Sequence, residues 1–163
     1  MNISELTSKA KKVINDILYI TIATCDKNNQ PWNSPVYSAF DKNYNFYWVS
    51  WKENQHSKNI KENDKVFVVI YDSTVPEGTG FGVYMRGKAR QLESKDAIEI
   101  VKSLKLLYSR KSKKPRKIEE FLGSLPRRIY KFVPEQVWVN SEGNVKGNFV
   151  DSRIDITSDI LKK

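Results

Sequence analysis

The chain has 163 residues and a mass of 18.9 kDa, with 39% hydrophobic and 12% aromatic residues, so it is long enough to bury one core. Its 28 Lys and Arg against 19 Asp and Glu give a net charge of +9, which favours anionic partners without choosing among nucleic acid, membrane surface and phosphorylated small molecules. One Cys and one His exclude an intrachain disulfide and a structural zinc site, which needs about four such ligands.

The first segment predicts an amphipathic helix over Ile3–Leu18. Its apolar residues recur at intervals of three and four, and Asn2 with Glu5 forms a capping-box pattern at its start. From Tyr19 the apolar period changes to two in a β-branched run. A strand is therefore expected almost where the helix stops.

Short polar turns join the next strand-like runs. Asp26–Gln30 links the first strand to Trp32–Phe40, and Asp41–Asn45 links that strand to Phe46–Trp51, a spacing typical of hairpins. The pattern predicts an antiparallel meander, followed by a helical connection over Asn54–Asn63.

The middle of the chain contains a strand and a helix with strong apolar patterns. Lys65–Asp72 is apolar on both faces, so we expect a central strand covered on both sides. A loop over Thr74–Gly82 precedes a long strand, Val83–Leu92, and a helix with an apolar stripe follows from Ser94. After that helix, Arg110–Lys117 holds six basic residues in eight positions.

The last third predicts a short helix over Lys117–Leu122, a strand over Arg128–Val139 and a weak edge strand around Ile154 and Ile156. These elements predict a mainly β fold with flanking helices, a small β-barrel in a single domain over residues 1–163. No stretch reaches the ~18 apolar residues of a membrane span, so we expect a soluble, cytoplasmic protein without membrane partners.

Two charged clusters and the lone Cys are candidates for function. His56, Ser57 and Lys58 stand at a predicted helix start, where free N–H groups favour an anion, although polar residues cap many helices. The run Arg110–Lys117 allows nucleic-acid contact, but it has no interleaved aromatics, so a solvated surface is favoured. Cys25 sits at a turn without a nucleophile motif, so we expect a bound cofactor to carry any redox chemistry.

Several stretches, taken in order, resemble the FMN-binding split β-barrel superfamily typified by pyridoxamine 5'-phosphate oxidase. They are Gln30–Val36, Phe46–Ser50, His56–Ile60, Val68–Ser73 and the step Arg86-Gly87-Lys88-Ala89, with residues 130–140 as a further echo of the closing strand. The resemblance covers about residues 5–92 and implies a six-stranded antiparallel split β-barrel.

The resemblance also implies FMN as cofactor and a homodimer whose two FMN sites lie at the subunit interface, each built from both chains. One strand would run beside the flavin ring, the next would approach the ring and ribityl chain, the helix start would hold the phosphate, and the second chain would close over the ring. Carried over by position, these residues are Asn33, Ser34, Pro35 and Val36; Val49 and Ser50; Gln55, His56, Ser57 and Lys58; and, from the second chain, Gly82 and Trp138.

The chain departs from the oxidases at two points. Ser34 stands where they carry a basic residue facing the phosphate, which either weakens FMN binding or shifts the charge to Lys58, His56 and Lys88. No His follows His56, so the C-terminal Arg-x-His element that the oxidases use for pyridoxal phosphate is missing. We therefore expect a small flavin-dependent oxidoreductase acting on another substrate, with its catalytic residues unassigned. Open alternatives are a deazaflavin- or haem-using relative and a non-catalytic module, either a barrel without flavin or a basic nucleic-acid-binding domain.

Overall fold

The computed structural model describes residues 1–145 and 148–161, of which 141–145 and 148–151 are described by backbone alone. The strands are β1 (Tyr19–Cys25), β2 (Pro31–Phe40), β3 (Phe46–Trp51), β4 (Lys65–Tyr71), β5 (Gly82–Gln91), β6 (Arg127–Val145) and β7 (Asn148–Asp155). The helices are α1 (Ile3–Asp16), α2 (Gln55–Glu62), α3 (Ala97–Arg110) and α4 (Thr157–Ile160), with 3-10 turns η1 (Ser94–Asp96) and η2 (Ile118–Phe121). Among the helices described, none is long and apolar enough to cross a bilayer.

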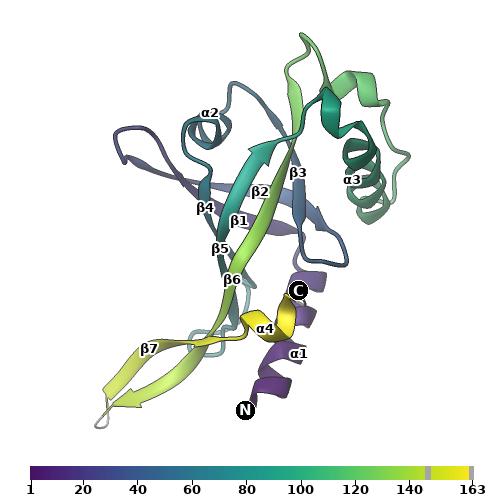
Figure 1. Cartoon of the computed structure of the whole chain (residues 1–163). Coiled ribbons are helices and arrows are strands. Elements are labelled where there is room, and N and C mark those ends of the chain that lie inside the picture. Colours follow the sequence, from purple (N-terminus) through teal and green to yellow (C-terminus); the bar gives the residue numbers. More distant parts are fainter. Residues whose placement is uncertain (146–147, 162–163) are drawn as a thin grey trace.

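The strands form a closed antiparallel barrel (Figure 1). Their order is β3-β2-β1-β4-β5-β6, and a further pairing between β3 and β6 closes the ring. The 19-residue β6 pairs with β3 and β5 along its first part and with the edge strand β7 along its last part, which extends beyond the barrel. The prediction of a six-stranded antiparallel barrel with flanking helices is therefore confirmed.

Alternation along β3 divides the buried residues between two clusters. Successive side chains of a strand point to opposite faces, so Trp48 enters the barrel while Tyr47 faces α3. Trp48 stacks on Tyr130 of β6 with ring centroids 5.7 Å apart. Tyr47 joins an outer cluster with Leu104 and Phe121, so α3 and η2 pack on the outside of the barrel wall.

The predicted boundaries of β2 to β5 hold to within one residue, whereas β6 continues beyond the predicted Val139 to Val145, where it pairs with β7. Two further differences have simple physical reasons. α1 ends at Asp16, two residues before the predicted Leu18, because Ile17 already has an extended backbone that leads into β1. β4 is central as predicted, between β1 and β5, but only its inward face is fully covered. Phe67 and Val69 on the outward face stay partly exposed in the single chain, so the expected cover on both sides is not found there.

Arg110 joins three elements that are distant in sequence. Its guanidinium donates hydrogen bonds to the carbonyl oxygens of Ile14, Asn15 and Ile17 at 3.3, 2.6 and 2.9 Å, and to that of Ser38 at 3.2 Å. The last carbonyls of a helix have no partner within the helix, and α1 has no basic residue in its own last turn. Arg110 supplies that charge, so the first residue of the basic run has a structural role.

Replacing Arg110 by Ala should lower the free energy of unfolding by about 2–3 kcal/mol, because hydrogen bonds from a charged donor to several carbonyls are lost. Arg110→Lys should recover little of the lost stability, since a single ammonium group cannot reproduce the planar set of N–H donors of a guanidinium. Urea unfolding monitored by tryptophan fluorescence measures the change. Lys105→Ala, at an exposed lysine of the same helix, is the matched control and should change stability by less than about 0.5 kcal/mol. Equal losses in the two variants would contradict the structural role.

Candidate functional site

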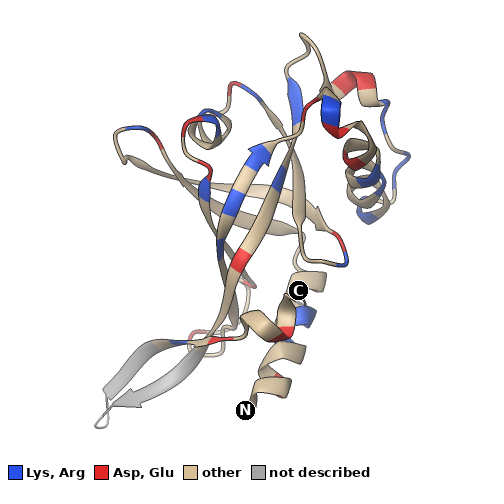
Figure 2. Cartoon of the chain, in the orientation of Figure 1, with Lys and Arg blue, Asp and Glu red and all other residues tan. Residues whose placement is uncertain are grey.

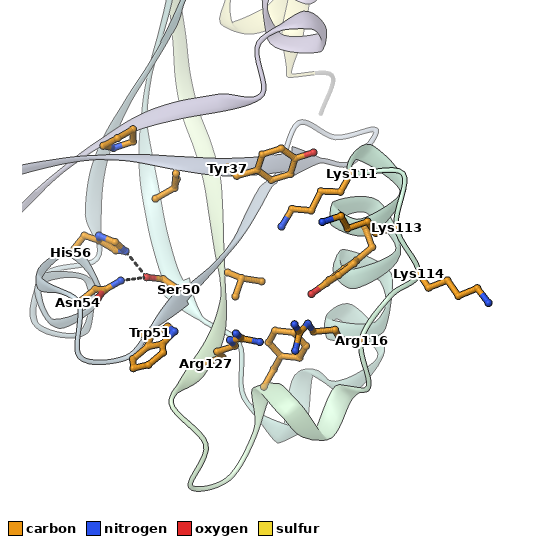
Figure 3. A pocket seen from close by; sticks show the side chains of 15 residues that line it. Tyr37, Ser50, Trp51, Asn54, His56, Lys111, Lys113, Lys114, Arg116 and Arg127 are labelled. Atoms are coloured by element: carbon orange, nitrogen blue, oxygen red, sulfur yellow. Dashed lines mark hydrogen bonds between the residues drawn. The ribbon is translucent and has the colours of Figure 1, made fainter.

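A cavity of about 630 Å³ lies between the barrel wall and the segment that follows α3. β2 and β3 with the start of α2 form one side, while the loop after α3, η2 and the start of β6 form the other (Figure 3). Apolar side chains cover part of its surface, among them Val36, Val49 and Phe121. The two sides differ in charge.

The first wall is a chain of neutral hydrogen-bonding groups around His56. Ser50 Oγ lies 2.7 Å from His56 Nε2, and Ser34 Oγ lies 3.1 Å from His56 Nδ1. Asn54 Nδ2 donates to Ser50 Oγ at 2.8 Å, and Trp32 Nε1 donates to Ser34 Oγ at 3.1 Å. His56 as a residue is only 7% exposed, and serine hydroxyls engage both of its ring nitrogens.

The path of the chain from β3 into α2 builds this wall. β3 ends at Trp51 and α2 begins at Gln55, so the first helical turn lies beside the strand end that carries Ser50. Asn54 occupies the N-cap position, but its side chain makes no capping bond to the helix backbone and turns to Ser50 instead. Asn54 and His56 at this helix start therefore contribute to the pocket.

The second wall is cationic. Figure 2 shows blue segments along the loop after α3. Figure 3 shows Lys111, Lys113, Arg116 and Arg127 around the cavity, while Lys114 points away from it. Arg116 pairs with Glu120 at 2.7 Å. Among the described residues that line the cavity, none is an Asp or Glu. The wall thus carries positive charge that the cavity itself does not neutralise.

Lys111 is a partly buried member of this wall. Its ammonium lies 4.6 Å from the ring centroid of Tyr37 and 5.4 Å from that of Tyr108, so it sits between two aromatic rings. Burial lowers the pKa of Lys111, and the positive charges of Lys113 and Arg116 lower it further. An anion bound here would relieve this repulsion, which makes the wall suited to a phosphate or carboxylate.

The structure brings together about half of the site residues expected from sequence. Those that line the cavity are Pro35, Val36, Val49, Ser50 and His56, and Ser34 contacts His56 from behind. Trp51, at the end of β3, also lines the cavity and is exposed.

The expected phosphate cluster is divided between two sides of α2. Ser57 and Lys58 line a second cavity of about 870 Å³ on the other side of the helix, where Lys58 lies 3.6 Å from Glu53. Gln55 donates its amide hydrogen bond to Asn59 within the helix. His56 is the member of the cluster that faces the cavity between β3 and the loop after α3.

Three further predicted positions lie outside this cavity in the single chain. Asn33 is exposed on β2, and the backbone N–H of Gly82 donates to Asn140 Oδ1 at 2.6 Å at the start of β5. Trp138 packs against Phe67 on the outward face of the sheet, with ring centroids 6.3 Å apart. The resemblance assigned Gly82 and Trp138 to a second chain.

Sequence reasoning did not assign the cationic wall to the site. The run containing Lys111, Lys113 and Arg116 was noted for its charge, and Arg127 was not noted at all. A usable signal was present, because a basic run without acidic residues follows a helix whose apolar stripe must pack against the sheet. Such a helix carries the run that follows it to the barrel surface.

Comparison with known proteins agrees with this architecture. The sequence model of the family described as pyridoxamine 5'-phosphate oxidase matches residues 6–141, which confirms the resemblance inferred from sequence. The UPF0306 protein PM1958 of Pasteurella multocida is 28% identical over 92 residues, which are 56% of this chain and 62% of that protein. The chain therefore matches less than two thirds of the length of this curated relative.

Solved structures from two other bacteria have the same fold. HutZ, described as a haem storage protein from Vibrio cholerae, aligns with a TM-score of 0.66 at 15% identity over 82% of this chain and 94% of its own. An FAD-binding protein of Mesorhizobium loti aligns with a TM-score of 0.60 at 18% identity over 81% and 91% of the two chains. At these identities the likeness is one of fold alone.

The buried imidazole should make stability depend on pH. Burial lowers the pKa of His56 below its ordinary value of 6.5, so the unfolded chain takes up a proton at a higher pH than the folded chain does. The free energy of unfolding should therefore fall as the pH drops below 6.5, until the folded pKa is reached. Urea unfolding of the wild type and of His56→Gln across this range measures the difference. Identical pH dependence in both proteins would contradict the buried, neutral imidazole.

Proposed function

The chain belongs to the pyridoxamine 5'-phosphate oxidase family, and from that premise we propose that it binds FMN in the cavity between β2, β3, α2 and the loop after α3. We propose further that the bound flavin serves a small oxidoreductase reaction. When bound, the flavin supplies the hydride chemistry, while the residues of this chain bind, orient and shield it.

The observation that carries this proposal is the combination of three surfaces in one cavity. A flavin mononucleotide needs a flat apolar surface, hydrogen-bonding groups at the ring edge and positive charge for its phosphate. Pro35, Val36 and Val49 offer the first, and the Ser50–His56 wall offers the second. The cationic wall offers the third, and a cavity of about 630 Å³ is in the range usual for ligands of this size.

The geometry favours the cationic wall over Lys58 as the phosphate site. Lys58 lines the other cavity and already faces a carboxylate, that of Glu53. Lys111 and Arg127 line the same cavity as His56, and no ion pair occupies either of them among the described residues. We therefore propose that Lys111 and Arg127 carry the charge that Ser34 does not supply.

Haem is the alternative cofactor, since HutZ is described as a haem storage protein. Histidine ligation would have to use His56, because it is the single histidine of the chain. Both of its ring nitrogens lie in hydrogen bonds, at 2.7 Å to Ser50 and 3.1 Å to Ser34. Iron coordination would break one of these bonds in a buried site, which favours flavin over histidine-ligated haem.

The outward face of the sheet supports a homodimer as part of the proposal. Phe67, Tyr84 and Trp138 are only partly buried there, and the guanidinium of Arg153 lies 5.7 Å from the ring centroid of Phe67 and 4.0 Å from that of Tyr84. Partly exposed aromatic residues on one sheet face are typical of an interface. A second copy on this face would bring its own Trp138 toward the flavin, as the family resemblance implies.

FMN fluorescence titration tests the cofactor and the phosphate site together. Lys111→Ala and Arg127→Ala should each weaken FMN binding about tenfold or more, because each removes one charged hydrogen bond to the phosphate, and each should change riboflavin binding by less than about twofold. Lys58→Ala is the matched control and should bind FMN like the wild type. Unchanged FMN fluorescence on adding the wild-type protein would contradict the proposal. A loss of FMN affinity confined to Lys58→Ala would instead indicate that the phosphate binds at the start of α2.

An absorbance spectrum separates flavin from haem. The purified wild type should show flavin absorbance, either as isolated or after adding FMN. After addition of haemin, the wild type and His56→Gln should show the same Soret absorbance, because the imidazole of His56 is held by two serine hydroxyls and does not bind the iron. A Soret band present in the wild type and lost in His56→Gln would favour the haem alternative.

A further inference from the structure

The wall of hydrogen bonds at His56 has defined donors at both ends. Trp32 Nε1–H donates to Ser34 Oγ, and Asn54 Nδ2–H donates to Ser50 Oγ. An indole N–H and an amide NH₂ donate only, so these two bonds have a fixed direction. The bonds between the two serines and the imidazole, at 3.1 and 2.7 Å, have no such fixed direction.

The number of protons available to the hydrogen bonds between Ser34, His56 and Ser50 can be counted. A serine hydroxyl has one proton and two lone pairs, and in each of these serines one lone pair is already taken by the fixed donor. A neutral imidazole has one N–H and one bare nitrogen. Each serine therefore either donates to the imidazole or accepts from it, and the two serines must do the opposite of one another.

Two arrangements satisfy this count. With the proton on Nε2, the imidazole donates to Ser50, both lone pairs of Ser50 are used, and its O–H is free to donate into the cavity. With the proton on Nδ1, the imidazole donates to Ser34, Ser50 donates to Nε2, and Ser50 offers the cavity a lone pair. The tautomer of His56 thus fixes the polarity of Ser50 toward a ligand.

We propose that His56 is a positioning residue whose tautomer switches Ser50 between hydrogen-bond donor and acceptor toward a ligand in the cavity. The matching ligand class is a heteroaromatic ring whose edge nitrogen gains a proton on reduction, because such an atom changes from acceptor to donor. The identity of this ligand rests on the proposed function. The switch itself rests only on the hydrogen bonds of Ser34, His56 and Ser50.

The surroundings keep the imidazole neutral, as the switch requires. Burial lowers the pKa of His56, so the ring is uncharged near neutral pH. The groups in direct contact with it, Ser34 from β2 and Ser50 from β3, carry no charge at this pH. The charged groups on the opposite wall of the cavity are Lys111, Lys113, Arg116 and Arg127, and their positive charge also disfavours an imidazolium.

The single histidine makes the switch directly measurable. Protein labelled with ¹⁵N-histidine gives one pair of ring-nitrogen signals, which report the nitrogen that carries the proton. Ser34→Ala removes the partner of Nδ1, so the proton should settle on Nε2 and donate to Ser50. Ser50→Ala removes the partner of Nε2, so the proton should settle on Nδ1 and donate to Ser34. Both expectations follow because an unmet N–H costs more than an unmet lone pair in a buried site.

Opposite tautomers in the two variants are the expected result. Ser38→Ala is the matched control, because Ser38 lies on the same strand as Ser34, is buried and has no hydrogen-bond partner for its hydroxyl. It should leave the histidine signals as they are in the wild type. The same tautomer in Ser34→Ala and Ser50→Ala, or a charged imidazole in the wild type at neutral pH, would overturn the proposal.

A second measurement adds oxidised FMN to the labelled wild type and then reduces it with dithionite. The protonated ring nitrogen should change between the two states, as the ring edge changes from acceptor to donor. Unchanged signals with FMN bound in both states would overturn the switch while leaving FMN binding intact. Failure of FMN to bind would instead count against the proposed function, and the variant pair in the free protein would still decide the switch.

Discussion

Antiparallel pairing between β3 and β6 is the contact on which both the barrel and the cavity depend. It closes the ring of strands, and the same register sets Trp51 opposite Arg127 and Ser50 opposite Arg128. The end of β3 therefore carries Ser50 of the neutral wall, while the start of its partner β6 carries Arg127 of the cationic wall. Because a shift of one residue would turn every side chain to the opposite face, the register fixes the composition of the site as well as the core.

The two walls hold their polar groups in different ways. The neutral wall is held by hydrogen bonds within the protein, since Ser34, Ser50 and His56 are all bonded there, and Ser50 keeps one further hydrogen-bonding position for a ligand. Lys111 and Lys113 have positive neighbours and no carboxylate among the described residues that line the cavity. Like charges held close together destabilise the unliganded state, and an anion that binds there stabilises the folded protein. The electrostatic arrangement therefore favours occupancy by an anionic ligand.

Periodicity predicted most of the fold, because α1, the hairpins and the central strand each bury one regular face. Of the positions that the family resemblance assigned on β2 and β3, Pro35, Val36, Val49 and Ser50 line the candidate cavity, and their role there stays a prediction. The resemblance could not resolve the helix start, since successive residues of an α-helix point about 100° apart. His56 and Lys58 consequently face different cavities, although they are neighbours in sequence. The cationic wall was not predicted because its position beside the cavity depends on the packing of α3 against β2 and β3, which are distant from α3 in sequence.

Closure of the barrel also governs when the cavity comes into existence. β3 and β6 lie far apart in sequence, and pairings of that kind must overcome a large loss of chain entropy before they contribute stability. A nascent chain that ends before Arg127 already carries Ser50, His56 and Lys111, yet it lacks the strand that closes the barrel behind them. The cavity proposed for the ligand is thus complete only after the first part of β6 has paired with β3.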